Sequence, residues 1–515
     1  MSPIVEVFAR VRAMIMISEC AQRQRPSRHS LKQEYIVLRR FMTALAFICH
    51  ASVVLVQSVV GPPSPVIGSI ATAGGTGANS AAANTVLAAP DGSPGAATMR
   101  ALVAADYPLA ALKANNPSDL ASAATARTNP GFTNVAGDDV MNASGQHFAS
   151  GCVAIEAFGG VGNGSTDTLA AWNAAVSSFR TKDICIKFGV GTYVFSNTAS
   201  ATPSGTAHIR IFGMGKSVTH LLWNVNVAGM ILTTGNEMTV EVDGLDFETR
   251  SFNANTALAV NSSDCSGSKY SSHFNDLSFR GQGNYLPSSY WTNDLLINNL
   301  SDVSATDVDF FGNRGNHTTG LTYQSSNPKT CVAIVLNVTH ANFINDKIGF
   351  LYGKAAQGVT ISQSNFANGL TGINVPVGSI GTAQLSVSDS QFNTTNDQIL
   401  IKGDLVGCQI MNNVFTVPAS PWNGIYINNA SANWFTILGN IFENTKTTGG
   451  DGIQVNANGA SNVGTITGNG FYNLGFGVGL QAGSRHWTVA SNSYNHVTTN
   501  VSNSGVSNLV GVATP

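Results

Sequence analysis

The sequence has few charged residues and no large surplus of either sign. Of 515 residues, 10% are charged, and 26 Lys and Arg against 28 Asp and Glu give a net charge of −2. Disordered chains combine high net charge with few apolar residues, and nucleic-acid-binding proteins carry basic surfaces. Because 43% of the residues are hydrophobic, the composition argues against a largely disordered chain and against a nucleic-acid partner.

Closely spaced cysteine pairs are also missing. The seven cysteines are scattered and form no C-x-x-C motif, whereas zinc sites use closely spaced ligand pairs. We therefore predict neither a metal nor a cofactor, and we expect the cysteines to be mainly buried, small apolar side chains.

Residues 1–60 contain a basic segment and one apolar run, Met42–Val56. The run is shorter than the roughly 20 residues of a membrane-spanning helix, so we predict no stable membrane insertion. A signal peptide read from an internal start at Met42 and an ordinary segment of a non-exported protein both fit this pattern. The sequence therefore leaves secretion open.

Residues 61–150 are rich in Gly, Ala, Ser and Pro, which predicts an irregular linker or slender neck. Within them, the string NTVLAAPDGSPGAATMRALVAADYP (Asn84–Pro108) resembles a segment of bacteriophage tail-fibre and tail-spike proteins that precedes their variable distal part. The alternative is a generic low-complexity linker. The resemblance implies a virion tail location and a homotrimer.

A structured region begins at Cys152. Residues 153–179 predict a short strand, a Gly-rich turn and a helix capped by Thr166 or Asp167. Two apolar strands around Gly191 follow, and then a Gly-x-Gly turn at residues 213–215.

This order of elements resembles the N-terminal cap of the pectate-lyase-like superfamily. The family has Asp where this chain has Asn163 and Thr168, and we expect these departures to leave the fold intact. The resemblance implies a right-handed parallel β-helix with a short helical cap, and residues 151–240 form this cap and the first coils. The matching residues are Phe158, Gly159, Gly162, Gly164, Asp167, Gly191, Thr192, Tyr193, Gly213 and Gly215.

From residue 241 to about 500, one pattern returns every 23–33 residues. An aliphatic or aromatic residue is followed five positions later by an aromatic residue, which predicts stacked coils with an interior aromatic column. A second column follows the aromatic one at Phe350, Ile373, Ile399, Ile425, Ile453 and Val478. The pairs are Val242/Phe247, Phe274/Phe279, Ala305/Phe310, Val338/Phe343, Ile361/Phe366, Val387/Phe392, Ile410/Phe415, Ile437/Phe442, Ile466/Phe471 and Val489/Tyr494.

The position two residues before the aromatic one is polar in six successive coils. Because Asn accepts turn conformations and bonds to neighbouring strands, we predict a polar ladder at a corner of the coils. The ladder comprises Ser364, Ser390, Asn413, Asn440, Asn469 and Asn492. Leucine-rich repeats and propellers fit this pattern less well, because Leu is sparse and a blade needs about 40 residues. Residues 501–515 form a tail.

Function should lie in lengthened loops on the outer face of such a solenoid. The two columns are further apart in two adjacent coils, which predicts enlarged loops at 417–423 and 444–451. Asp397 and Asp451 lie two coils apart, so at about 4.8 Å per coil they should be roughly 10 Å apart. This distance is near the separation of the two carboxylates in inverting glycosidases. We predict Asp397, Asp451 and Glu443 as catalytic residues and Trp422, Tyr426 and Asn423 as substrate-binding residues.

Asp-Gly at 451–452 and Asn-Gly at 423–424 are ordinary turn dipeptides, and Asp397 lies in a polar turn. A purely structural role for these acids is therefore the alternative. A second candidate cluster is Asp307, Asp309, Arg314 and His317, of which Asp307 and Asp309 share one strand face. The motif set of polygalacturonase-type hydrolases is missing, which disfavours pectin hydrolysis by that mechanism.

The leading interpretation is a polysaccharide-binding β-helix protein that resembles tail spikes, which bind and often cleave bacterial surface glycans. The sequence leaves open whether the chain is an enzyme and, if it is, whether it is a polysaccharide lyase or a glycoside hydrolase. A secreted pectate-lyase-like enzyme is the first alternative. A structural or adhesion protein without enzymatic activity is the second.

Overall fold

The computed structural model describes residues 85–88, 98–101 and most of 152–511. Within the last range it leaves out 180–182, 204–207, 236–237, 264–270, 283–287, 314–317, 327–331, 379–383, 429–431, 445–448 and 458–461. The predicted apolar run, most of the predicted neck, and Arg314 and His317 therefore lie outside the described residues. The chain divides into two units, Met1–Ala110 and Ala111–Pro515.

In the first unit, β1 (Thr85–Ala88) pairs antiparallel with β2 (Thr98–Ala101). These strands fall within the string that resembles tail-fibre proteins. The sequence analysis does not predict them, because the segment shows little periodicity.

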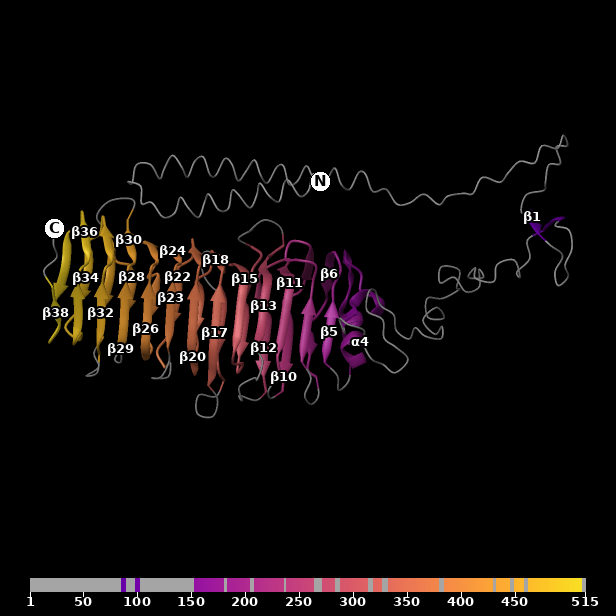
Figure 1. Ribbon diagram of the computed structural model, residues 1–515, viewed down its shortest axis with the longest axis horizontal. Coiled ribbons are helices and arrows are strands. Elements are labelled where there is room, and N and C mark those ends of the chain that lie inside the picture. Colours follow the sequence, from indigo (N-terminus) through magenta and orange to yellow (C-terminus); the bar gives the residue numbers. More distant parts are fainter. Residues whose placement is uncertain are drawn as a thin grey trace, which may run out of the picture. The chain divides into compact units, whose positions relative to one another are not determined.

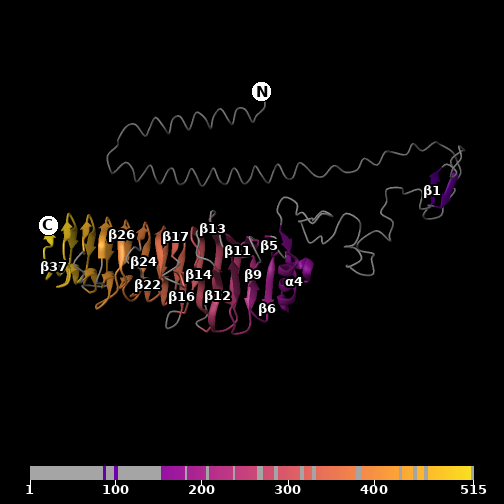
Figure 2. The same ribbon diagram turned by 90° about the horizontal axis from the view of Figure 1, so that it is seen from below.

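The second unit is a parallel β-helix, which confirms the predicted fold. Its strands stack in chain order from the N-terminal cap to the C-terminal coils (Figures 1 and 2). A typical coil has three strands that belong to three sheets, here named the first, second and third sheet. In one coil these are β26 (Leu405–Met411), β27 (Val414–Thr416) and β28 (Asn423–Ile427).

The first sheet contains β3 (Val153–Ala154), β5 (Ile184–Lys187), β8 (Ile209–Phe212), β17 (Ala333–Thr339), β20 (Ala356–Ser362), β23 (Leu385–Ser388), β26, β29 (Ala432–Leu438), β32 (Gly464–Thr467), β35 (Trp487–Ala490) and β38 (Leu509–Val510). The second contains β4 (Asn163–Asp167), β6 (Gly191–Phe195), β9 (Thr219–Trp223), β18 (Asn342–Ile344), β21 (Asn365–Ala367), β24 (Gln391–Asn393), β27, β30 (Ile441–Glu443), β33 (Gly470–Tyr472) and β36 (Ser493–Asn495). Three long strands belong to both: β11 (Val240–Thr249), β13 (Ser272–Gly281) and β15 (Val303–Phe311).

The third sheet has 12 strands. They are β7 (Ala199–Ala201), β10 (Met230–Thr234), β12 (Asn253–Ser262), β14 (Trp291–Asn298), β16 (Thr319–Gln324), β19 (Ile348–Tyr352), β22 (Thr371–Val375), β25 (Ile399–Ile401), β28, β31 (Asp451–Val455), β34 (Phe476–Leu480) and β37 (Thr499–Asn503). Among the described residues, no helix is long and apolar enough to cross a membrane.

A short helical cap covers the first coils, as the resemblance implied. It contains the 3-10 helix η4 (Ile155–Phe158) and α4 (Leu169–Phe179), at one end of the row of strands (Figure 1). Asp167 Oδ1 accepts a hydrogen bond from the Leu169 N–H at 3.1 Å, which confirms Asp167 as a capping residue. The buried Trp172 closes the core by stacking on Phe188, with ring centroids 6.2 Å apart.

Cys152 and Cys185 form a disulfide bond between the cap and β5. This corrects the expectation that the cysteines serve mainly as buried apolar side chains, although Cys408 is buried and unpaired as expected. The two cysteines are 33 residues apart in sequence, and only the return of the chain after α4 brings them together.

The predicted aromatic column is confirmed. From Phe247 to Tyr494 the rings of successive coils stack with centroids 4.5–5.4 Å apart and planes within 19° of parallel. Strand register extends the column two coils upstream, to Leu221 and Tyr193. The sequence pattern missed these coils because the longer loop 213–218 separates Ile211 from Leu221, so these two residues are more than five positions apart.

The second interior column is also confirmed by the pairing of β19, β22, β25, β28, β31 and β34. Most positions just before it are glycines that face the aromatic column. A Cβ at Gly349 would lie 2.7 Å from Phe366 Cδ1, and one at Gly372 would lie 2.9 Å from Phe392 Cδ1. The close-packed rings thus exclude larger side chains at these positions.

The polar ladder lies between the first and second sheets, as predicted. Each member accepts a hydrogen bond from the backbone N–H of the preceding member through its side-chain oxygen; for example, the Asn413 N–H donates to Asn440 Oδ1 at 2.9 Å. The same bond recurs from Ser364 to Asn492 at 2.9–3.1 Å. All six side chains are buried, so the ladder fixes the register of these coils from inside.

Candidate functional site

Two adjacent coils carry enlarged loops at one corner, where the sequence predicts them. Residues 417–422 join β27 to β28, and residues 444–450 join β30 to β31, whereas only three residues join β21 to β22. The loops are in contact: the Val417 N–H donates to the Glu443 carbonyl at 2.7 Å. A Cβ at Gly450 would lie 2.0 Å from the Pro418 carbonyl oxygen, so this approach requires glycine.

Asp397 lies beneath this corner and is buried. Its Oδ1 accepts hydrogen bonds from the Asn423 backbone N–H at 3.1 Å and from Asn423 Nδ2 at 2.7 Å. Burial raises the pKa of Asp397, and the bonds from Asn423 offset part of that rise. The structure therefore brings Asp397 and Asn423 together, with Asp397 holding Asn423 in place.

Asp451 lies on the next coil, in register with Asn423. Its backbone N–H donates to the Trp422 carbonyl at 3.1 Å, and its Oδ2 accepts from Gln454 Nε2 at 2.9 Å. The side chain is partly exposed. Burial raises its pKa, although the bond from Gln454 opposes this rise. Asp451 is thus an acid that solvent can reach and whose pKa lies above that of a free aspartate.

The other predicted residues surround these acids. Trp422 is 37% exposed on the first enlarged loop. Tyr426 is partly exposed between the buried Ile425 and Ile427, so it lies on the outer face of the third sheet. Glu443 is partly exposed at the end of β30. The corner thus combines acids with aromatic surface, and the catalytic and binding roles of these residues remain predictions.

The second predicted cluster is organised by a residue that the sequence analysis did not name. Lys216 Nζ lies 3.0 Å from Asp307 Oδ1, 3.0 Å from Asp309 Oδ2 and 3.9 Å from Asp276 Oδ1. Burial opposes the charge on Lys216, but its bonds to Asp307 and Asp309 outweigh this effect and raise its pKa. Lys216 lies in the loop 213–218, which departs from the five-residue spacing of the later coils.

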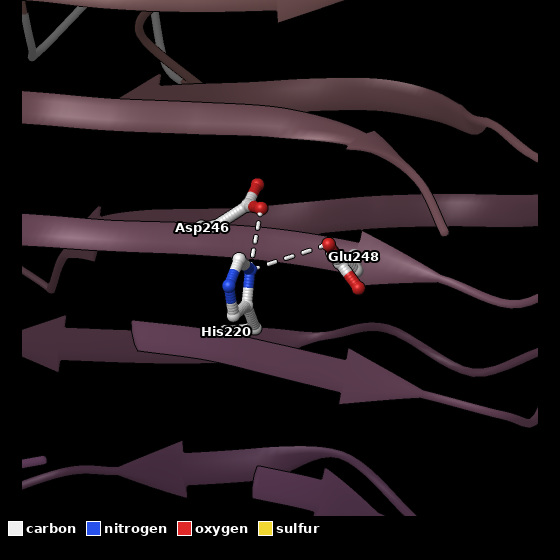
Figure 3. Close-up of side chains that lie close together, drawn as sticks. All are labelled: His220, Asp246 and Glu248. Carbon is white, nitrogen blue, oxygen red and sulfur yellow. Dashed lines mark hydrogen bonds and ion pairs between the residues drawn. The ribbon is translucent and has the colours of Figure 1, made fainter. Parts of the chain in front are cut away.

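A further charged cluster lies on the outer face of the second sheet. His220 Nδ1 is 2.9 Å from Asp246 Oδ2 and 3.3 Å from Glu248 Oε1, from neighbouring strands (Figure 3). On the next coil, Arg280 Nε donates to Asp246 Oδ2 at 2.8 Å, and Arg280 Nη2 lies 2.8 Å from Glu248 Oε1. The cluster therefore links three successive coils.

One ligand atom from each of His220, Asp246 and Glu248 lies within 4.8 Å of the others, as in a metal site. Two observations favour an ion-pair network instead. The Arg280 guanidinium already occupies the same carboxylate oxygens. Bonds to Asp246 and Glu248 also raise the pKa of His220 to about 9, so a proton occupies the nitrogen that a metal would need.

The sequence contained a signal for this cluster. Strand alternation turns the neighbours of an interior residue outward, and Asp246 and Glu248 flank Phe247, while Arg280 follows Phe279. In a chain with 10% charged residues, charges beside the aromatic column in adjacent coils predict ion pairs across the coils.

No family model matches the sequence, and no curated protein matches it. Among solved structures, the chain is similar to tailspike protein 3 of bacteriophage CBA120, with 13% identity and a TM-score of 0.43. That match covers 70% of this chain and 59% of the tailspike, so the matched part spans less than two thirds of that protein.

Two further similarities involve a second tailspike and an adhesin. The Dettilon tailspike protein is 12% identical, with a TM-score of 0.46 over 70% of this chain and 68% of that one. The Streptococcus pneumoniae surface adhesin PfbA is 12% identical, with a TM-score of 0.37 over 68% of this chain and 93% of that one. The assignment of the fold to this chain rests on the strand pairing described above.

Proposed function

We propose that this protein binds a bacterial surface polysaccharide on its coils and hydrolyses it at the corner formed by the two enlarged loops. The observation that carries the proposal is Asp451, a solvent-accessible acid with a raised pKa on the loop that packs against the Trp422 loop. A general acid must hold its proton near neutral pH to protonate a leaving sugar oxygen. An indole ring offers the flat apolar area on which a sugar ring stacks.

In this proposal Asp451 donates its proton to the glycosidic oxygen. A second acid accepts a proton from the water that attacks the anomeric carbon, so the bond is hydrolysed with inversion. Glu443 is the more exposed choice for this base. Asp397 lies two coils from Asp451, roughly 10 Å away at about 4.8 Å per coil, but its bonds to Asn423 favour a positioning role.

Incubation with a panel of bacterial capsular polysaccharides tests this function. We expect the wild type to release new reducing ends without the unsaturated product of a lyase. Asp451→Asn should lower the rate by at least about 100-fold with unchanged binding, and Glu443→Gln should lower it similarly. Asp404→Asn, an acid outside this corner, is the control.

Binding without cleavage would support the alternative of an adhesion protein and overturn the hydrolase. Unsaturated products would indicate a lyase. The tail-spike resemblance also predicts a homotrimer at a virion tail, and the mass of the purified protein in solution tests the trimer.

A further inference from the structure

The outer face of the first sheet carries side chains aligned in two parallel columns. Strand register places one residue of each coil over its equivalent in the next coil, at a repeat of about 4.8 Å. The first column comprises Arg210, Glu241, His273, Ser304, Asn337, Thr360, Ser386, Gln409, Thr436, Thr465 and Thr488. The second lies two residues further along each strand and comprises Phe212, Asp243, Asn275, Thr306, Thr339, Ser362, Ser388, Met411, Leu438, Thr467 and Ala490.

Two hollows in the surface follow the first column. One, of about 620 Å³, is lined by Arg210, Glu241 and His273 and extends to Asp302. The other, of about 390 Å³, is lined by Asn337, Thr360, Ser386 and Gln409. In the first column, Ser304 lies between His273 of the first hollow and Asn337 of the second. Both hollows therefore follow the axis of the β-helix on one sheet, and the strip of the first sheet that contains them is here called the groove.

Charge is confined to one end of this groove. From Ser304 to Thr488 and from Thr306 to Ala490, the two columns contain no charged residue. Most of these residues carry hydroxyl or amide groups, which donate and accept hydrogen bonds. An interface with another copy of the chain would be apolar at its centre, whereas these columns are mainly polar. The composition matches the hydroxyl groups of an uncharged polysaccharide.

An exposed aromatic residue borders the uncharged part of the groove. Trp434 lies one coil beyond Gly407, which lines the second hollow, and both have a positive φ, 55° and 78°. The Trp434 side chain is 68% exposed, and Leu438 on the same strand is 39% exposed. Leu438 in turn pairs with Met411. This strand therefore presents indole and aliphatic surface beside Thr436, as sugar stacking requires.

We propose that this groove binds one extended, uncharged polysaccharide along the axis of the β-helix, with a sugar ring on Trp434. The inference rests on the proposed function and adds a second surface, separate from the enlarged-loop corner. Recognition would come from hydrogen bonds and stacking rather than from ion pairs. Affinity should therefore change little between low and high salt, because salt screens charge pairs.

Binding of neutral and acidic capsular polysaccharides to the full chain, measured by calorimetry at low and high salt, tests the groove. Trp434→Ala should weaken binding of the neutral polymer by at least about tenfold. Thr360→Arg, which places a long side chain in the second hollow, should weaken it similarly. Asn374→Arg, which places the same long side chain on the third sheet, is the matched control. Trp422→Ala reports separately on binding at the enlarged-loop corner. Circular dichroism and solution mass verify folding and assembly.

The outcomes separate the two proposals. Loss of binding in Trp434→Ala and Thr360→Arg, with Asn374→Arg unchanged, supports the groove. Normal binding by both groove variants, with loss in Trp422→Ala, overturns the groove and leaves the proposed function standing. A change in oligomeric mass in both groove variants also overturns it, because the face would then contact another copy. If the wild type binds no polysaccharide of the panel, the proposed function fails and the groove with it.

Discussion

The corner between the first and second sheets is stabilised differently in the coils before and after residue 340. In β11, β13 and β15 one long strand runs through the corner, and the positions two before the aromatic residue are apolar: Leu245, Leu277 and Val308. Charged clusters around Lys216 and Arg280 cover these coils from outside. In the later coils the strand breaks into two, and the buried Ser and Asn ladder takes the equivalent position.

The comparison indicates that the aromatic column forms the core of every coil in both regions. The corner between the first and second sheets can be stabilised either by ion pairs on the outside or by hydrogen bonds on the inside. Ion pairs on the outside leave charge on the surface of the early coils. Hydrogen bonds on the inside need no charge at this corner, and the outer columns of the first sheet in the later coils carry no charged residue. We infer that the internal ladder is what permits a neutral outer face. Four changes test this difference.

The largest loss of stability should come from a change in the aromatic column, which both regions share. Phe415 is fully buried, with its ring 4.8 Å from Phe392 and 4.6 Å from Phe442. Phe415→Ala leaves a cavity in the column and should cost about 3–5 kcal/mol. Thermal unfolding and hydrogen exchange should show the loss in neighbouring coils first, because each coil contacts only its neighbours. A uniform loss over all coils would contradict this coil-by-coil account.

Removal of one ladder residue should affect only the later coils. Asn440 accepts hydrogen bonds from the Asn413 N–H and Nδ2 and donates to the Ile410 carbonyl. Asn440→Ala leaves these buried groups without partners and should cost about 3 kcal/mol. The loss should be the same in low and high salt. The exposed Asn393→Ala serves as the control.

Arg280→Met breaks the corresponding outer network of the early coils. Among the described residues, this leaves the buried Asp246 and Glu248 with His220 as their one cationic partner. Because Arg280 is partly exposed, we expect a cost of about 2 kcal/mol, between those of buried and surface ion pairs. High salt should shrink the difference from the wild type, unlike that of Asn440→Ala. An equal salt response in both variants would mean that the two corners are held alike.

The smallest effect concerns two buried acids near the junction of the two regions. Asp294 occupies a position that is Gly320 in the next coil, and its carboxyl has no hydrogen-bond partner among the described residues. Burial and the charge of Asp346 raise its pKa. Burial also raises the pKa of Asp346, which Thr318 offsets in part.

A raised folded-state pKa means that the folded chain binds more protons than the unfolded chain. The stability that this adds is present below the unfolded pKa of about 3.9 and is lost as the pH rises above it. Asp294→Asn, which cannot ionise, should therefore stabilise the protein at pH 7 by about 1 kcal/mol. The melting temperatures of the wild type and of Asp294→Asn should converge as the pH falls toward about 4. A variant that is less stable at pH 7 would show that Asp294 is charged and paired.

The sequence predicted the later coils well, because their loops keep a constant offset between the columns. It missed the disulfide, and its repeat pattern did not reach the first coils, which only the resemblance implied, because loop 213–218 changes the spacing there and brings in Lys216. For the predicted site, the columns correctly indicated the enlarged loops and the proximity of Asp397, Asn423 and Asp451. They could not show that Asp397 is buried and accepts two hydrogen bonds from Asn423, because both features depend on how the loops pack.

The proposed binding face is formed by the outer columns of the first sheet. A crystal structure of the protein with an uncharged capsular oligosaccharide tests this directly. We predict that the sugar chain lies along the axis of the β-helix over Thr360, Ser386 and Gln409, with one ring on the Trp434 indole. A sugar chain bound only at the Trp422 corner, with Trp434 exposed to solvent, would contradict it.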